Sequence, residues 1–130
     1  MTNTFTIASY NIWFDPTLYL ERTKSLCKYL NAINTDVVCL QEVRPEIYKL
    51  LIAMLKNFPY HFPNEINQSY DCAIFSKYPI LQSTNIKYPK SSMYRSLNVV
   101  KIEYPYIIKV INGMKTEHLI TKNIELIIAT

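Results

Sequence analysis

Cysteine is scarce in this sequence, and its three copies are poorly placed for a metal cluster or a disulfide framework. Cys27, Cys39 and Cys72 show no metal-binding spacing, and an odd number of cysteines cannot all pair within one chain. Two of them lie inside apolar runs, where reduced thiols are common. We therefore expect an intracellular protein, with no particular compartment indicated.

The sequence also lacks any apolar run close to the roughly 18 to 20 residues that a membrane-spanning helix requires, so no membrane partner is expected. Its first residues, Met1 to Phe5, are polar and do not resemble a secretion signal. Hydrophobic residues make up 49% of the 130 and charged residues 18%, which excludes a disordered chain and predicts one globular domain over residues 1–130. The net charge of +4 favours an anionic partner only slightly.

The segment around which the rest of the chain is arranged runs from Asp36 to Glu42. Four consecutive apolar residues, Val37 to Leu40, predict a central strand, because a strand covered on both faces has no reason to alternate. Gln41 and Glu42 follow directly. Glu42 is therefore placed at the carboxyl end of a buried strand, where open α/β sheets bind ligands, and a metal cation is a natural partner for a carboxylate held there.

Two helices are predicted around this strand. The first is expected to be capped by Asp15, to begin at Pro16 and to end near Asn34. Its expected inward face is Leu26, Leu30 and Ile33, with Cys27 beside it and Arg22 among the residues outside. The second helix opens at Pro45 and carries apolar residues at helical spacing.

The remaining runs predict strands, so the expected fold class is α/β (α+β), a mixed β-sheet with two helices on one face. Helix-joined strands favour parallel pairing, and the short later connections favour antiparallel hairpins. The expected strands cover residues 5–12, 72–75, 80–87, 94–103, 106–111 and 124–130. Residues 59–69 are expected to form a surface loop, with room for a short extended piece.

Three short motifs coincide with these strands. Ser9-Tyr10-Asn11-Ile12 closes the first, Leu40-Gln41-Glu42-Val43 closes the central one, and Ala73-Ile74-Phe75-Ser76-Lys77 lies in the third. Their order and spacing resemble the opening motifs of the endonuclease/exonuclease/phosphatase superfamily. Within it, the segment from Ser91 to Leu97, with an arginine before a strand, resembles the tyrosyl-DNA phosphodiesterase 2 branch. The resemblance implies the first half of a four-layer α/β sandwich.

The same resemblance implies a site and an activity. Glu42 matches the glutamate that holds Mg²⁺, with Mn²⁺ as an alternative, against the scissile phosphate. Asn11 matches the asparagine that orients that phosphate, and Arg95 is similar to an arginine that contacts the nucleic-acid strand. These matches imply a metal-dependent phosphodiesterase or nuclease of DNA repair whose partner is the 5′ end of DNA. One glutamate is chemically sufficient, because Mg²⁺ keeps several waters and takes few carboxylates.

Three later motifs of the superfamily are not clearly present: a Thr/Ser-His-Leu-Glu segment, an Asp-x-Asn pair and a terminal Ser-Asp-His. The segment Thr116-Glu117-His118-Leu119 resembles the first only superficially, because no apolar strand leads into the histidine. The better aligned strand is Ile124 to Thr130. We therefore expect an amino-terminal fragment that holds Mg²⁺ weakly and is inactive alone, because the groups for proton transfer are missing.

An isolated half of such a sandwich exposes one apolar sheet face. Soluble monomers rarely show such a face, so we expect either self-association or the docking of a complementing second half. Three functions remain open on this evidence. They are a phosphodiesterase that needs a second half, a catalytically dead remnant, and a binding or assembly module that uses the exposed sheet face.

Each candidate residue also has a purely structural interpretation. Glu42 is compatible with a solvated carboxylate at a strand end, Asn11 with the start of a turn, and Arg95 with an ordinary charged loop. His118 is interpreted as a loop residue. The eleven tyrosines, Tyr29 and Tyr48 among them, are interpreted as packing and turn residues.

Overall fold

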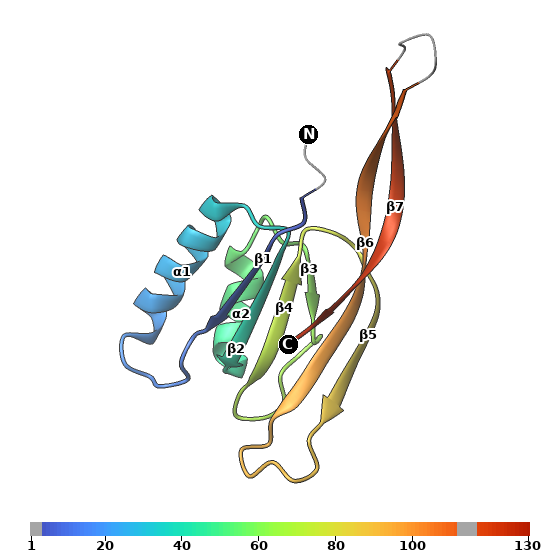
Figure 1. The fold of residues 1–130 in the computed structure, drawn as a ribbon. Coiled ribbons are helices and arrows are strands. Elements are labelled where there is room, and N and C mark those ends of the chain that lie inside the picture. Colours follow the sequence, from blue (N-terminus) through green and yellow to red (C-terminus); the bar gives the residue numbers. More distant parts are fainter. Residues whose placement is uncertain (1–3, 112–116) are drawn as a thin grey trace.

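The computed structural model describes residues 4–111 and 117–130, arranged as two β-sheets and two helices (Figure 1). One sheet has the strand order β1-β2-β4-β3, comprising β1 (Ile7–Asn11), β2 (Val37–Val43), β4 (Asp71–Ser76) and β3 (Tyr60–Phe62). The second sheet has the order β5-β6-β7, comprising β5 (Ile80–Lys87), β6 (Ser96–Ile111) and β7 (Glu117–Ala129). The helices are α1 (Tyr19–Ile33) and α2 (Pro45–Met54).

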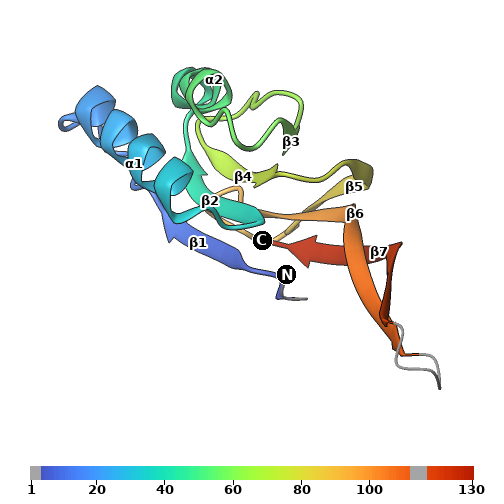
Figure 2. The ribbon, with the colours of Figure 1, turned by 90° about the horizontal axis from the view of Figure 1, so that it is seen from above.

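The elements form three layers. Both helices lie on one face of the four-stranded sheet, and the three-stranded sheet lies against the other face (Figure 2). The central strand β2 pairs in parallel with β1 and antiparallel with β4, so the four-stranded sheet is mixed, whereas the three-stranded sheet is antiparallel throughout. The predicted fold class is confirmed, and the structure adds that the strands divide into two sheets.

Strand β2 supplies side chains to both cores. Val38 and Leu40 pack in the core beneath the helices, whereas Val37 and Cys39 pack in the core between the two sheets. None of the four is more than 3% exposed. Burying a valine or leucine side chain fully contributes about 1.5 to 3 kcal/mol, so both faces stabilise this strand. Two-sided burial is the physical reason for the unbroken apolar run.

The predicted start of α1 is wrong. The helix begins at Tyr19, and its N-cap, Leu18, has a left-handed φ of 48° and makes no side-chain cap. The Asp15 carboxylate instead accepts hydrogen bonds from the backbone N–H of Thr17 at 2.9 Å and from its hydroxyl at 2.6 Å. Asp15 therefore closes a local turn in the loop. Its Oδ1 accepts both hydrogen bonds from Thr17 and does not cap the helix.

The inward face of α1 is narrower than predicted. Cys27 and Leu30 are buried and Leu26 is partly buried, but Ile33 is exposed at the last helical position. Tyr29 is also exposed, contrary to the packing interpretation. The second helix begins at Pro45 as predicted. Among the described residues, neither helix is long and apolar enough to cross a membrane.

The two strands predicted on either side of Pro105 are one continuous strand, β6. The N–H of Asn98 points toward β7, where it donates to Thr130 O, and the N–H of Glu103 points the other way, to Pro79 O. The nitrogen of Pro105, two residues beyond Glu103, faces the same side as that of Glu103. Because β5 begins only at Ile80, this side of β6 has no β5 partner at Pro105, and proline is tolerated at such an edge.

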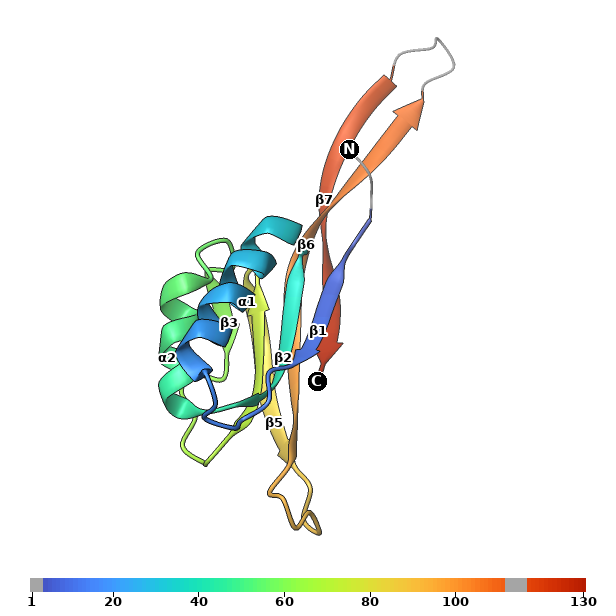
Figure 3. The same cartoon turned by 90° about the vertical axis from the view of Figure 1, so that its left-hand side faces the viewer.

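The paired strands β6 and β7 extend beyond the layered body as a long ribbon (Figure 3). His118 lies on β7 opposite Val110, so its interpretation as a loop residue is wrong. The predicted connection around Gly113 and the residue Thr116 lie outside the described residues.

Candidate functional site

Glu42 lies on a β-bulge at the end of β2. The pairing of β2 with β4 shifts register between Leu40 and Val43, so that Gln41 and Glu42 together oppose Cys72 alone. Glu42 has a φ of 59°, in the left-handed region that favours glycine. Such a backbone costs about 1 to 3 kcal/mol, and bulges commonly redirect a side chain near functional sites. The strain is thus located at the candidate carboxylate.

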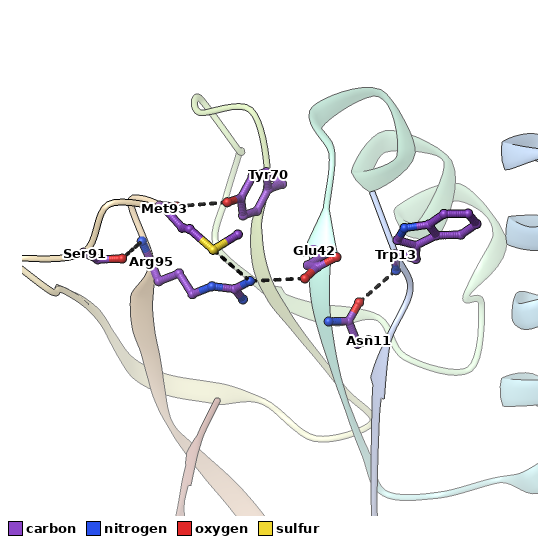
Figure 4. Close-up of polar contacts among 7 residues, drawn as sticks. All are labelled: Asn11, Trp13, Glu42, Tyr70, Ser91, Met93 and Arg95. Atoms are coloured by element: carbon purple, nitrogen blue, oxygen red, sulfur yellow. Dashed lines mark hydrogen bonds and ion pairs between the residues drawn. The ribbon is translucent and has the colours of Figure 1, made fainter. Parts of the chain in front are cut away.

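Arg95 pairs directly with this carboxylate. Its guanidinium donates to Glu42 Oε1 at 3.2 Å across the gap between β2 and the segment that leads into β6 (Figure 4). The Glu42 side chain is 11% exposed and that of Arg95 is 41% exposed. The Arg95 backbone is held as well, because its N–H donates to Ser91 Oγ at 3.1 Å. The structure therefore brings together two residues that are 53 positions apart in sequence.

Asn11 closes a turn and lies beside the Glu42 carboxyl. Its Oδ1 accepts from the backbone N–H of Trp13 at 2.9 Å, which closes a turn directly after β1. Its side chain also lies near enough to the Glu42 carboxyl to lower the pKa of that group. With Oδ1 fixed on the turn, the Asn11 amide nitrogen is the group that faces Glu42, so the turn orients the side chain for the site (Figure 4).

The surroundings of Glu42 favour its ionised form. Burial raises the pKa of this carboxyl, but hydrogen bonds from Asn11, Arg95 and the backbone N–H of Phe14 lower it by more. The net result is a pKa below the ordinary value of 4.5. Glu42 is therefore a carboxylate at neutral pH, with donors arranged on more than one side.

Lowering the pH is expected to remove the stability that Glu42 contributes. Because its pKa is lower in the folded chain than in the unfolded chain, the unfolded chain binds the proton more readily. The contribution is fully present above the unfolded value of 4.5 and is lost as the pH falls through the folded pKa. Urea unfolding of wild type and Glu42→Gln across this range measures the difference, which should be constant at higher pH and shrink in acid.

A matched variant controls for the loss of any surface carboxylate. Glu46 pairs with Arg44 at 3.0 Å, but its side chain is 54% exposed, so Glu46→Gln should change the free energy of unfolding little at any pH. If the difference in free energy of unfolding between wild type and Glu42→Gln does not shrink in acid, the lowered pKa of Glu42 is contradicted.

Arg22 is a part of this region that the sequence analysis missed. It was placed on the outer side of α1, but its Nη2 donates to the carbonyls of Trp13 at 3.0 Å and Asp15 at 2.8 Å. Its guanidinium also lies 4.7 Å from the centre of the Trp13 ring. Phe14, between these two carbonyls, has a backbone N–H that lowers the pKa of Glu42, so Arg22 holds the loop that borders the site. An arginine in the first turns of a helix, shortly after an irregular loop, is the only sequence signal for this contact.

Aromatic side chains surround the site. A hollow of about 140 Å³ is lined by Glu42, Tyr70, Asp71, Cys72, Tyr88, Tyr94, Arg95 and Ser96. Tyr70 stacks on Phe14 with ring centres 5.0 Å apart, and its hydroxyl donates to Met93 O at 3.1 Å. The Arg95 guanidinium lies 6.0 Å from the Tyr70 ring. The hollow therefore presents one partly exposed cation, two carboxylates and several aromatic walls.

The site offers a divalent cation one protein ligand, the Glu42 carboxylate. A carboxylate suits Mg²⁺, which retains several waters, and Glu42 is ionised and directed into the hollow. Among residues 4–111 and 117–130, however, no three His, Cys, Asp or Glu side chains converge to hold a metal. Asp71 also lines the hollow, but its Oδ1 already accepts from Cys72 N and Ser96 Oγ. One oxygen of Glu42, Oε1, is likewise engaged by Arg95, so each of the two carboxylates has one oxygen in a contact. Glu42, which its donors keep ionised, is the side chain that would hold the ion.

Cys27 and Cys39 do not line the hollow. All three cysteines are free thiols, and burial raises the pKa of Cys27 and of Cys39 to about 11. Both are therefore protonated and inert at neutral pH, as the expectation of reduced, buried thiols requires.

Comparison with known proteins matches residues 8–113 to the model of the Endonuclease/Exonuclease/phosphatase family. TDP2 from D. rerio, humanized by 14 mutations, has 26% sequence identity and a TM-score of 0.68, over 75% of this chain and 41% of its own. D. rerio TDP2 complexed with a single-strand DNA product has 21% identity and a TM-score of 0.69, and the match covers 92% of this chain and 45% of that structure's chain. TDP2 from C. elegans has 24% identity and a TM-score of 0.67, and the match covers 74% of this chain and 30% of that structure's chain.

The chain therefore spans less than half the length of each of these three structures. No curated protein matches the sequence.

Proposed function

Because the chain belongs to the endonuclease/exonuclease/phosphatase family, we propose that it carries one half of a divalent-metal-dependent phosphodiesterase site for nucleic-acid ends. The observation that supports this proposal is the pairing of Glu42 and Arg95, 3.2 Å apart, at one hollow, with Asn11 beside the Glu42 carboxyl. One structural neighbour was crystallised with a single-strand DNA product, which supports nucleic acid as the substrate class.

Each of the three residues has a role that follows from its chemistry. Arg95 binds the phosphate, because a guanidinium presents planar paired donors that match phosphate oxygens and its side chain is 41% exposed. Asn11 orients the Glu42 carboxylate with its amide nitrogen. Glu42 would hold Mg²⁺ or Mn²⁺, and such an ion, when bound, stabilises the negative charge that develops on the phosphate oxygens.

The other half of the site must supply the proton transfers. No histidine lines the hollow among the described side chains, and Asp71 there is engaged by two donors. We propose that a second half docks against this chain and completes the site. The edge strand β1 supports this idea, because its outer side has no strand partner among the described residues and a groove of about 840 Å³ lies between it and α1.

Release of a 5′-tyrosyl group from a short oligonucleotide in the presence of Mg²⁺ tests the proposal. The chain alone is expected to react no faster than its Glu42→Ala variant at equal concentration, because general acid–base groups contribute roughly 10²- to 10⁴-fold in rate. Turnover by wild type that Glu42→Ala abolishes would show that this chain supplies the missing groups itself. His118 would then be the first residue to replace.

A second candidate function, assembly through a sheet face, is favoured by the outer side of the three-stranded sheet. The inner side of that sheet packs on the four-stranded sheet, and the two helices lie on the far side of the latter (Figure 2). The outer side carries an apolar row that includes Ile86 at 50% and Ile127 at 70% exposure, continued by the partly exposed Leu97 and Val99. We propose that this row drives self-association of the isolated chain.

Replacing Ile127 with lysine is expected to weaken that association at least roughly tenfold, because an unpaired charge would be buried at the contact. Analytical ultracentrifugation over a concentration series measures the effect. Ile52→Lys provides a matched control, since Ile52 is 38% exposed on α2 and remote from this face. Equal effects of the two substitutions would exclude the outer sheet face as the contact.

A further inference from the structure

A buried polar network joins the two sheets directly behind Glu42. Asn98 on β6 is fully buried, although its neighbours in the core between the sheets include Ile74 and Val100. Its Nδ2 donates to the Cys72 carbonyl at 2.7 Å, and its Oδ1 accepts from Asn85 Nδ2 at 2.6 Å. A buried amide costs free energy unless it is hydrogen-bonded, and both ends of this amide have partners.

The carbonyl that Asn98 binds belongs to the residue opposite the bulge. Cys72 is the single β4 residue that faces Gln41 and Glu42, and bulges disrupt the regular ladder of backbone hydrogen bonds. The Cys72 carbonyl lies beyond the last pair of β3 and β4, Phe62 with Ile74, and the bond from Asn98 satisfies it on the strand that faces the bulge. An apolar residue at position 98 would pack in this core but would leave that carbonyl without this donor.

A second contact holds the preceding residue of β4. Ser96 Oγ donates to Asp71 Oδ1 at 2.9 Å, and Asn85 Nδ2 also donates to Ser96 Oγ at 2.8 Å. The neighbouring Arg95 is the ion-pair partner of Glu42. One short stretch of chain, residues 95–98, therefore contacts both the Glu42 carboxylate and the strand that faces its bulge.

We propose that Asn98 is a positioning residue that fixes the Gln41–Glu42 bulge through the Cys72 carbonyl and so holds the Glu42 carboxylate against Arg95. This inference deepens the proposed function and rests on it for the role of Glu42 in phosphodiester chemistry. The bulge, the 2.7 Å hydrogen bond and the burial of Asn98 are independent of that role.

Two substitutions separate positioning from packing. Asn98→Leu fills the same space without hydrogen-bonding groups. Asn98→Asp keeps the acceptor for Asn85 but cannot donate to Cys72 O when it is ionised. Both are expected to accelerate hydrogen–deuterium exchange of the backbone amides at residues 41–43 roughly tenfold relative to amides of α2, and to weaken binding of a 5′-phosphorylated oligonucleotide.

Asn31→Leu is the matched control, because Asn31 Nδ2 also donates to a backbone carbonyl, Met54 O at 3.0 Å, but between the two helices. It should alter exchange in α2 and leave residues 41–43 unchanged. If Asn98→Leu does not fold, Asn98→Ser, which keeps a shorter donor, should show a smaller acceleration at the same three amides. Exchange at residues 41–43 that changes only in proportion to global stability would overturn the proposal.

The two readouts distinguish failure of this inference from failure of the proposed function. Faster exchange at residues 41–43 with unchanged oligonucleotide binding would support the positioning role and count against the phosphodiesterase site. Binding that depends on Arg95 together with unchanged exchange in both Asn98 variants would overturn the positioning role and leave the site intact.

Discussion

Replacing Arg95 with alanine is expected to weaken binding of a 5′-phosphorylated single-stranded oligonucleotide by roughly tenfold or more. A hydrogen bond to a charged group contributes about 1.5 to 3 kcal/mol, and each 1.4 kcal/mol corresponds to about tenfold in affinity. Arg95 is the arginine that lines the hollow, and 41% of its side chain is exposed there. Fluorescence anisotropy at one fixed salt concentration, with Mg²⁺ present, measures the loss.

Arg44→Ala is the control for a general loss of positive charge. Arg44 has a similar side-chain exposure of 37% and is also ion-paired, but its partner is Glu46 rather than Glu42. It should change the affinity far less than Arg95→Ala. Arg95→Lys should fall between the two, because lysine keeps the charge but lacks the planar pair of donors.

Loss of Arg95 also leaves the Glu42 carboxylate, which is 11% exposed, without its ion-pair partner. The folded fraction of each variant is therefore measured by circular dichroism at the temperature of the binding experiment. Equal weakening by Arg95→Ala and Arg44→Ala, with both variants folded, would contradict a phosphate contact at Arg95.

Replacing Phe75 with alanine is expected to lower the free energy of unfolding by about 3 to 5 kcal/mol. The Phe75 side chain is fully buried beneath α2, where its ring lies 5.8 Å from that of Tyr48 and 6.0 Å from that of His61. Truncation removes this burial and leaves a cavity between β4 and the helix. Since a domain is stable by only about 5 to 15 kcal/mol, a large part of the total is lost. Urea unfolding, monitored by circular dichroism, measures this loss in the free energy of unfolding.

Tyr60→Ala is the matched control, because Tyr60 is an aromatic residue on the neighbouring strand β3 but is 40% exposed. It should cost less than half as much as Phe75→Ala. Phe75→Leu, which retains most of the buried volume, should cost about 1.5 kcal/mol or less. Similar losses for Phe75→Ala and Tyr60→Ala would mean that the core beneath α2 does not determine the stability of the chain.

Features that depend only on neighbouring residues could be predicted from the local sequence. The apolar run from Val37 to Leu40 specified a strand buried on both faces, because only two-sided burial removes the alternation. Pro45 specified the start of α2, because proline has no N–H to lose at the first helical position. The position of Glu42 at the end of β2 followed from the same local pattern.

Which distant groups meet could be seen only in the folded chain. Arg22 points back to the loop, where it donates to two backbone carbonyls, and Asn98 is buried where it donates to the Cys72 carbonyl of the other sheet. Arg95 reaches Glu42 only because the two sheets pack face to face. Polar side chains pair with whatever unsatisfied groups the fold places beside them, and that information is not contained in the local spacing of residues along the chain.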